Sequence, residues 1–227
     1  MNSALLKWYD INKKAMPWRE DTDPYRIWIS EVMLQQTQVN TVIPYYNKWM
    51  KKFPNIKKVA LSDIDVILKL WEGLGYYKRA HNIQKACRII VEDFDATIPS
   101  TEEFKNLPGI GDYIYSAVMS IAFNQALPVI DGNVKRVGAR FWETNFINTK
   151  DLKVLKEKLL KTISQKRPGC FNQALMDLGR EICKPKTPLC NQCPISKQCQ
   201  AFKHNSVPNY PYKIKSKKIP LIDVVVG

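Results

Sequence analysis

Four cysteines near the C-terminal end of the chain have the spacing of metal ligands. Cys183, Cys190, Cys193 and Cys199 lie within seventeen residues and are separated by six, two and five residues. Four thiolates at short spacing in a loop can surround a cubic iron–sulfur cluster, whereas tetrahedral zinc sites more often pair two Cys-x-x-Cys knuckles across a longer gap. Only one such knuckle is present. The spacing therefore favours a [4Fe-4S] cluster, with zinc or four unliganded thiols as the alternatives.

Two carboxylates are candidates for acid–base chemistry. Glu31 lies among apolar residues in the stretch SEVMLQQT, where partial burial would raise its pKa and make it a proton donor. Asp131 precedes Asn133 and Lys135, whose side chains favour its ionised form. Two carboxylates in different environments can divide the cleavage of a glycosidic bond, because one gives a proton and the other opposes positive charge on the sugar. The alternatives are a solvated helix residue for Glu31 and a helix cap for Asp131, and no spacing rule brings the two together.

A glycine-rich pentapeptide is a candidate phosphate site. Leu107, Pro108, Gly109, Ile110 and Gly111 separate an expected helix that ends near Asn106 from one that begins near Asp112. Glycines at the start of a helix allow main-chain N–H groups to converge on an anion, and the helix dipole adds partial positive charge. A phosphate of the DNA backbone would fit this loop, and an ordinary tight turn is the alternative.

Helices must position these groups, because apolar residues recur at helical spacing through most of the chain and sustained two-residue alternation is absent before the tail. The pattern predicts an all-α protein. Asp23 followed by Pro24 predicts the cap and the first residue of a helix, which places Glu31 about two turns into it. Pro44 and Pro54 are expected to punctuate the helices that follow.

The composition favours a polyanionic partner. The 35 basic and 21 acidic residues leave a formal net charge of +14, which favours salt-sensitive association with nucleic acid. No leader-like N-terminus and no apolar run of about 20 residues is present, so we expect no membrane partner and a cytoplasmic, nucleoid-associated location. In such a reducing compartment disulfides are rare, and Cys87 and Cys170 are expected to be packing residues.

The last part of the chain differs from the rest. Residues 204–227 contain prolines, a basic run from Lys213 to Lys218 and a β-branched stretch from Ile219 to Val226. This composition predicts a linker that leads into a strand, and hence the start of a second domain that is missing beyond it.

Together these motifs resemble those of the MutY family of A/G-specific adenine DNA glycosylases, within the helix-hairpin-helix superfamily of endonuclease III. The resemblance runs from about Trp8 to Gln200. It rests on MPW at residues 16–18, SEVMLQQTQV at 30–39, GLGYY at 73–77, LPGIG at 107–111, DGNVKR at 131–136, FNQALMDLG at 171–179 and the cysteine spacing.

The resemblance implies two helical lobes with duplex DNA across the cleft between them and a target adenosine flipped into it. One lobe would comprise residues 22–130, with six helices and the hairpin, and the other residues 1–21 and 131–203, with the cluster. In this arrangement Glu31 is the general acid and Asp131 stabilises the oxocarbenium-like sugar, with or without a transient covalent bond. The other implied site residues are Asn133, which orients Asp131; Gln35 and Gln36, which face the mispair; Tyr76, which wedges beside the orphaned purine; and Leu107, Gly109, Gly111 and Lys135, which contact DNA.

Tyr113 occupies the hairpin-helix position where lyase relatives carry a Schiff-base lysine. Tyrosine cannot form that bond, so the resemblance implies a monofunctional glycosylase that excises adenine opposite guanine or 8-oxoguanine and acts as a monomer. Asp112 departs from the basic or neutral residue usual in the family and is explained if it caps the helix, while Ile114, Tyr115 and Ser116 replace smaller residues. Without the C-terminal domain, preference for 8-oxoguanine over guanine should be weakened.

Three other functions are compatible with parts of this pattern. A thymine glycosylase acting on G:T mispairs shares the tyrosine at position 113. A non-catalytic DNA-binding relative would have no chemical need for Glu31, Asp131 and Asn133 together. An electron carrier would use the cluster but leave the hairpin, both carboxylates and the positive charge unexplained.

Overall fold

The regular structure of residues 1–212 is helical, as the residue periodicity predicts. The computed structural model describes residues 1–212, and within them no strand is present. The α-helices are α1 (Asn2–Asn12), α2 (Pro24–Leu34), α3 (Val39–Lys52), α4 (Ile56–Ala60), α5 (Ile64–Trp71), α6 (Lys78–Asp93), α7 (Asp112–Ala122), α8 (Gly132–Phe141), α9 (Thr149–Leu160), α10 (Pro168–Glu181) and α11 (Gln200–Lys203). The 3-10 turns are η1 (Pro17–Arg19), η2 (Glu102–Asn106), η3 (Cys190–Gln192), η4 (Ser196–Gln198) and η5 (Val207–Asn209).

The start of α2, the helix that carries Glu31, is determined by local sequence. The side chain of Asp23 accepts a hydrogen bond from the main-chain N–H of Arg26 at 3.0 Å, and Pro24 occupies the first helical position, where its missing N–H would have no partner in any case. Glu31 consequently lies two turns into α2, as predicted.

The prediction that Pro44 interrupts a helix is wrong. Pro44 lies inside α3, where its missing N–H removes a main-chain hydrogen bond. The helix continues because one of its faces is buried, with Val42, Tyr46 and Trp49 almost inaccessible to solvent. Burying an aromatic or aliphatic side chain contributes about 1.5–3 kcal/mol each, which offsets the cost of about 3 kcal/mol for proline.

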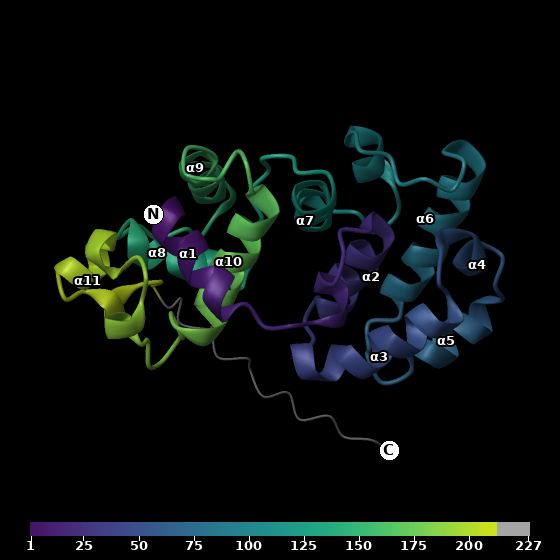
Figure 1. Ribbon diagram of the computed structural model, residues 1–227, viewed down its shortest axis with the longest axis horizontal. Coiled ribbons are helices and arrows are strands. Elements are labelled where there is room, and N and C mark those ends of the chain that lie inside the picture. Colours follow the sequence, from purple (N-terminus) through teal and green to yellow (C-terminus); the bar gives the residue numbers. More distant parts are fainter. Residues whose placement is uncertain (213–227) are drawn as a thin grey trace, which may run out of the picture.

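Buried apolar side chains form two separate clusters. The first extends from Met16 to Met119 and has Trp28, Trp49 and Trp71 at its centre. The second joins α1 to the helices that follow residue 130, and it includes Leu5 and Phe171. Figure 1 shows α2 to α6 at one end of the molecule, α1 and α8 to α11 at the other, and α7 between them. The lobe limits at residues 22 and 130 stay predictions.

Helix α7 connects the two ends because it packs against both α2 and α10. The contact with α10 depends on Gly169. A Cβ atom at this position would lie 2.7 Å from the Cα of Ile121 and from the carbonyl oxygen of Ser120, so only glycine allows the two helices to approach this closely.

The expected strand at Ile219–Val226 and the basic run from Lys213 lie outside the described residues. Among residues 1–212, no helix has the length and apolar character that a membrane crossing requires.

Candidate active site

Glu31 is a buried carboxyl group with one hydroxyl partner. The residue is 5% exposed, and the hydroxyl of Tyr113 on α7 donates a hydrogen bond to Oε2 at 2.6 Å. Burial raises the pKa of Glu31 above its ordinary range and outweighs the bond from Tyr113 and the positive charge of Arg19, which both lower it. The solvated alternative for Glu31 is therefore excluded, and the group is suited to hold a proton.

Asp131 caps α8 and at the same time faces open space. Its Oδ1 accepts from the N–H of Val134 at 2.7 Å, and its Oδ2 accepts from Nδ2 of Asn133 at 2.9 Å. The two donors hold the carboxylate in one orientation. The cap alternative for Asp131 is thus correct as local structure, yet its side chain also lines the cleft described below.

Arg136 extends this chain of contacts to the cysteine segment. Its Nη2 donates to Oδ1 of Asn133 at 2.7 Å and to the carbonyl oxygen of Gly179 at 2.8 Å, and its Nε donates to the carbonyl oxygen of Cys183 at 2.8 Å. Gly179 permits this arrangement, because a Cβ there would lie 2.6 Å from Cβ of Asn133. The orientation of Asn133 is therefore determined by both α8 and α10.

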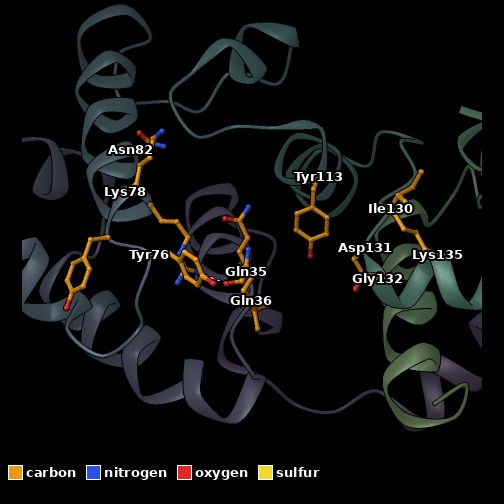
Figure 2. A pocket seen from close by; sticks show the side chains of 13 residues that line it. Gln35, Gln36, Tyr76, Lys78, Asn82, Tyr113, Ile130, Asp131, Gly132 and Lys135 are labelled. Atoms are coloured by element: carbon orange, nitrogen blue, oxygen red, sulfur yellow. Dashed lines mark hydrogen bonds between the residues drawn. The ribbon is translucent and has the colours of Figure 1, made fainter. Parts of the chain in front are cut away.

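A cleft of about 900 Å³ brings together residues of α2, α6, α7 and α8 and of the loops beside them. Its lining includes Gln35, Gln36, Tyr76, Tyr113, Asp131 and Lys135. Figure 2 shows Tyr113 between the glutamine pair and Asp131. A second cavity of about 470 Å³ shares Tyr113 and Asp131 and adds Asn133. Glu31 lines neither cavity, so the Tyr113 hydroxyl is its contact toward the cleft.

The glycine-rich hairpin joins η2 to α7, so the expected helix before it is a 3-10 turn. Gly109 has φ +82°, and a Cβ atom there would lie 2.8 Å from Cβ of Asn82 on α6. Gly111 is the N-cap of α7. The side chain of Leu107 is buried in the first cluster, so its main chain is the part nearest to solvent.

The interpretation of Asp112 as a helix cap is wrong. Gly111 occupies the cap position, and Asp112, whose side chain is 81% exposed, pairs instead with Nζ of Lys105 at 2.6 Å. The ion pair compensates part of the negative charge beside the hairpin. The unusual Ile114, Tyr115 and Ser116 are all buried, so the core accommodates their larger volume.

The four predicted ligand cysteines line one small cavity beside α11. All of them are free thiols, as are Cys87, which is buried as expected, and Cys170, which is half-buried. Among residues 1–212, no three His, Cys, Asp or Glu side chains converge closely enough to bind a single metal ion. The thiols thus share a cavity without meeting at one point.

Arg140 is buried against this cysteine segment. Its Nη1 lies 3.3 Å from Sγ of Cys183 and donates to the carbonyl oxygen of Lys184 at 2.8 Å. Its own carbonyl oxygen accepts from the thiol of Cys199 at 3.3 Å. One cation therefore contacts the sulfur of Cys183 and holds the loop that follows it.

Two contacts near the site were not predicted from sequence. Arg19, directly after the MPW motif, forms a bidentate ion pair with Asp177 at 2.8 and 3.0 Å, and its charge reaches Glu31. Asn172 accepts from the N–H of Val129 at 3.1 Å and so fixes the segment before Asp131. The available signal was that Arg19 follows the MPW motif and that Asn172 lies within FNQALMDLG, but residue type alone does not identify partners that are 158 and 43 residues away.

The sequence profile of the HhH-GPD superfamily of base excision DNA repair proteins matches residues 29–165. An adenine DNA glycosylase of Buchnera aphidicola subsp. Schizaphis graminum is 43% identical over 224 residues, which cover 96% of this chain and 64% of that protein. The chain therefore spans less than two thirds of the length of this relative.

Solved structures share the architecture. A thermostable thymine-DNA glycosylase aligns with a TM-score of 0.81 at 28% identity, over 89% of this chain and 94% of the other. A trapped covalent intermediate of endonuclease III with DNA aligns with a TM-score of 0.74 at 22% identity, over 89% and 95%, which supports the fold alone. The profile match covers more than half of the chain. The chain thus belongs to the HhH-GPD superfamily of base excision DNA repair proteins.

Proposed function

We propose that the chain is a monofunctional DNA glycosylase that removes adenine mispaired with guanine or 8-oxoguanine. The observation that carries the proposal is a pair of carboxyl groups near Tyr113: Glu31, which is buried, has a raised pKa and accepts a bond from the Tyr113 hydroxyl, and Asp131, which lines the cleft with Tyr113 and is held by two donors. The similarity to an adenine DNA glycosylase supports the choice of base.

Glu31 supplies the proton for the departing base. Its raised pKa keeps a larger fraction of the group protonated near neutral pH than for an exposed glutamate. Protonating a ring nitrogen of adenine makes the base a better leaving group, and bond cleavage then leaves positive charge on the sugar. Since Tyr113 stands between Glu31 and the cleft, a small movement of its ring is needed to admit the base.

Asp131 opposes the positive charge that develops on the sugar. The two hydrogen bonds from Asn133 and Val134 hold its carboxylate in one orientation, so little reorganisation is needed as the charge forms. Asn133 is in turn held by Arg136.

DNA would lie along the hairpin, with a phosphate on the N–H groups of Gly109 and Gly111 and Lys135 adding positive charge beside Asp131, while the N–H of Ile110 donates within the hairpin to the carbonyl oxygen of Leu107. Gln35, Gln36 and Tyr76 then face the base opposite the flipped adenosine. The phenol of Tyr113 has no amine for a Schiff base, so water adds to C1′ of the sugar cation and releases a proton, and the product is an abasic site with both strands intact.

The four cysteines at the shared cavity would hold a [4Fe-4S] cluster. The donor set fits, because four thiols without a disulfide surround one space beside a buried arginine. When bound, the cluster supplies a rigid crosslink for residues 183–199 and a site for electron exchange. About four iron and four sulfide per purified chain are expected, with the content reduced in Cys193→Ser. One zinc per chain and no sulfide would refute the cluster.

The test is single-turnover base release from duplexes that contain one A:G, A:8-oxoguanine, T:G or A:T pair. Adenine release from the first two, lost in Glu31→Gln and Asp131→Asn, with strand cleavage only after alkali, is the expected result. Preferential thymine release from T:G would instead support the activity named for the thymine-DNA glycosylase. Tight binding with no release of any base would support a non-catalytic DNA-binding protein.

A further inference from the structure

Arg79, in the first turn of α6, lies between two loops that line the cleft. Within residues 1–212 it forms no ion pair with an acidic side chain, and its guanidinium bonds to five main-chain carbonyl oxygens. The position of this guanidinium is tightly constrained, because its planar set of N–H donors must meet several fixed acceptors at once.

One nitrogen of Arg79 caps the helix of Glu31. Nη1 donates to the carbonyl oxygens of Val32, Met33 and Gln35 at 2.8, 3.2 and 2.7 Å. The last carbonyls of a helix have no partner within it, and a cation is favoured at this end of the dipole. Arg79 therefore fixes the end of α2 and the start of the loop that carries Gln35 and Gln36.

The other nitrogen holds the loop that carries Tyr76. Nη2 donates to the carbonyl oxygens of Leu74 and Gly75 at 3.0 and 3.2 Å. The guanidinium carbon also lies 5.3 Å from the ring centre of Trp71 and 5.5 Å from that of Tyr76, within the range of cation–π attraction. A single side chain thus bridges both loops.

Each loop contains a residue in the left-handed region of backbone conformation. Gln36 has φ 58° and Tyr76 has φ 49°, which is unfavourable for residues with a side chain and persists only where the surroundings impose it. Tyr76 is also 62% exposed, so packing alone does not fix it. The five bonds of Arg79 supply the constraint that these loops need.

We propose that Arg79 is a positioning residue that holds the Gln35–Gln36 loop and the Gly73–Tyr77 loop in one geometry, so that the base opposite the flipped adenosine meets a preformed surface. The inference rests on the proposed function. It assigns to Arg79 a role in discriminating between the bases that can lie opposite the flipped adenosine, while proton transfer remains with Glu31.

The test compares Arg79→Lys with a matched control, Arg88→Lys. Lysine keeps the positive charge but presents a single ammonium, which cannot reach both sets of carbonyls. Arg88 lies on the same helix and donates through Nε to one carbonyl oxygen, that of Ala60, at 3.2 Å, away from the cleft. Single-turnover rates are measured on duplexes with adenine opposite guanine, 8-oxoguanine, cytosine and thymine.

In Arg79→Lys the preference for adenine opposite guanine over adenine opposite cytosine or thymine should fall about tenfold or more, and in Arg88→Lys it should not change. Hydrogen exchange should accelerate over residues 33–38 and 72–77 of Arg79→Lys and remain unchanged elsewhere. Unchanged discrimination with unchanged exchange would overturn the proposal. An equal loss on all duplexes, with faster exchange throughout the chain, would show a purely structural role and overturn it as well.

The two proposals fail in different ways. If the wild-type chain releases no adenine, the proposed function fails, whereas the exchange rates of the two loops still test whether Arg79 holds them.

Discussion

Replacing the first glycine of the hairpin is expected to destabilise the chain much more than replacing the second. In Gly109→Ala the new residue has to adopt φ +82°, and its Cβ would lie 2.8 Å from Cβ and 3.0 Å from Nδ2 of Asn82. The left-handed conformation costs about 1–2 kcal/mol and overpacking about 1–3 kcal/mol. A loss of about 2–5 kcal/mol lowers Tm by about 4–20 °C in a chain of this size.

Gly111→Ala is the matched control. Gly111 has φ −90°, and a Cβ atom added there would have no heavy atom within 4 Å. The free energy of unfolding should fall by no more than about 1 kcal/mol, because the new methyl group neither strains the main chain nor meets a neighbour and only the N-cap preference for glycine over alanine is lost.

Thermal unfolding followed by circular dichroism, under reducing conditions and at one pH, measures both variants. A double-mutant cycle of Gly109→Ala with Asn82→Gly separates the cost of the left-handed conformation from the cost of overpacking. Only the overpacking cost couples to residue 82. Equal Tm values for the two alanine variants, or a larger loss in Gly111→Ala, would refute the reasoning.

Three further predictions concern the carboxyl groups and their supports. Burial raises the pKa of Glu31 in the folded chain above its value of about 4.3 in the unfolded chain. The free energy of unfolding of the wild type therefore falls as pH rises from the unfolded pKa to the folded pKa. The Tm of Glu31→Gln should exceed that of the wild type by a margin that grows with pH and vanishes below about pH 4. Tyr113→Phe removes a hydrogen bond that lowers the pKa of Glu31, so this pKa should rise. The alkaline limb of the pH–rate profile should therefore move to higher pH. A shift to lower pH would contradict the assignment of Glu31 as the acid. Gly179→Ala places a Cβ 2.6 Å from Cβ of Asn133 and so displaces the amide that holds Asp131. Adenine release should slow about tenfold, which corresponds to about 1.4 kcal/mol. An unchanged single-turnover rate would show that Asn133 does not support Asp131 in the reaction.

The active site depends on contacts between segments that are distant in sequence. The Tyr113 hydroxyl and Glu31 are 82 residues apart, and Arg19 and Asp177 are 158 residues apart. Helix α7 makes the first contact possible because it packs against α2 and α10 together. A change at a helix crossing such as Gly169 is therefore expected to act on the site without touching it.

Sequence alone determined the features that depend on neighbouring residues. The cap at Asp23 and Pro24 placed Glu31 two turns into a helix, because capping and helical periodicity act over a few residues. The glycines of the hairpin indicated unusual backbone geometry, which Gly109 adopts. The cysteine spacing indicated a shared site, and the four thiols line one cavity.

Tertiary structure alone decided the environment of these groups. Local sequence suggested partial burial of Glu31, but its almost complete burial and its partner Tyr113 depend on how α7 packs on α2. The interruption expected at Pro44 did not occur, because burial of the face of α3 that carries Val42, Tyr46 and Trp49 outweighs the lost hydrogen bond. The role of Arg79 could not be predicted either, since its acceptors are carbonyl groups, which every residue possesses. The spacing of residues in the sequence identifies which chemistry a chain can carry. The burial and the long-range partners of these residues set their pKa values and orientations, and both arise only when the lobes pack.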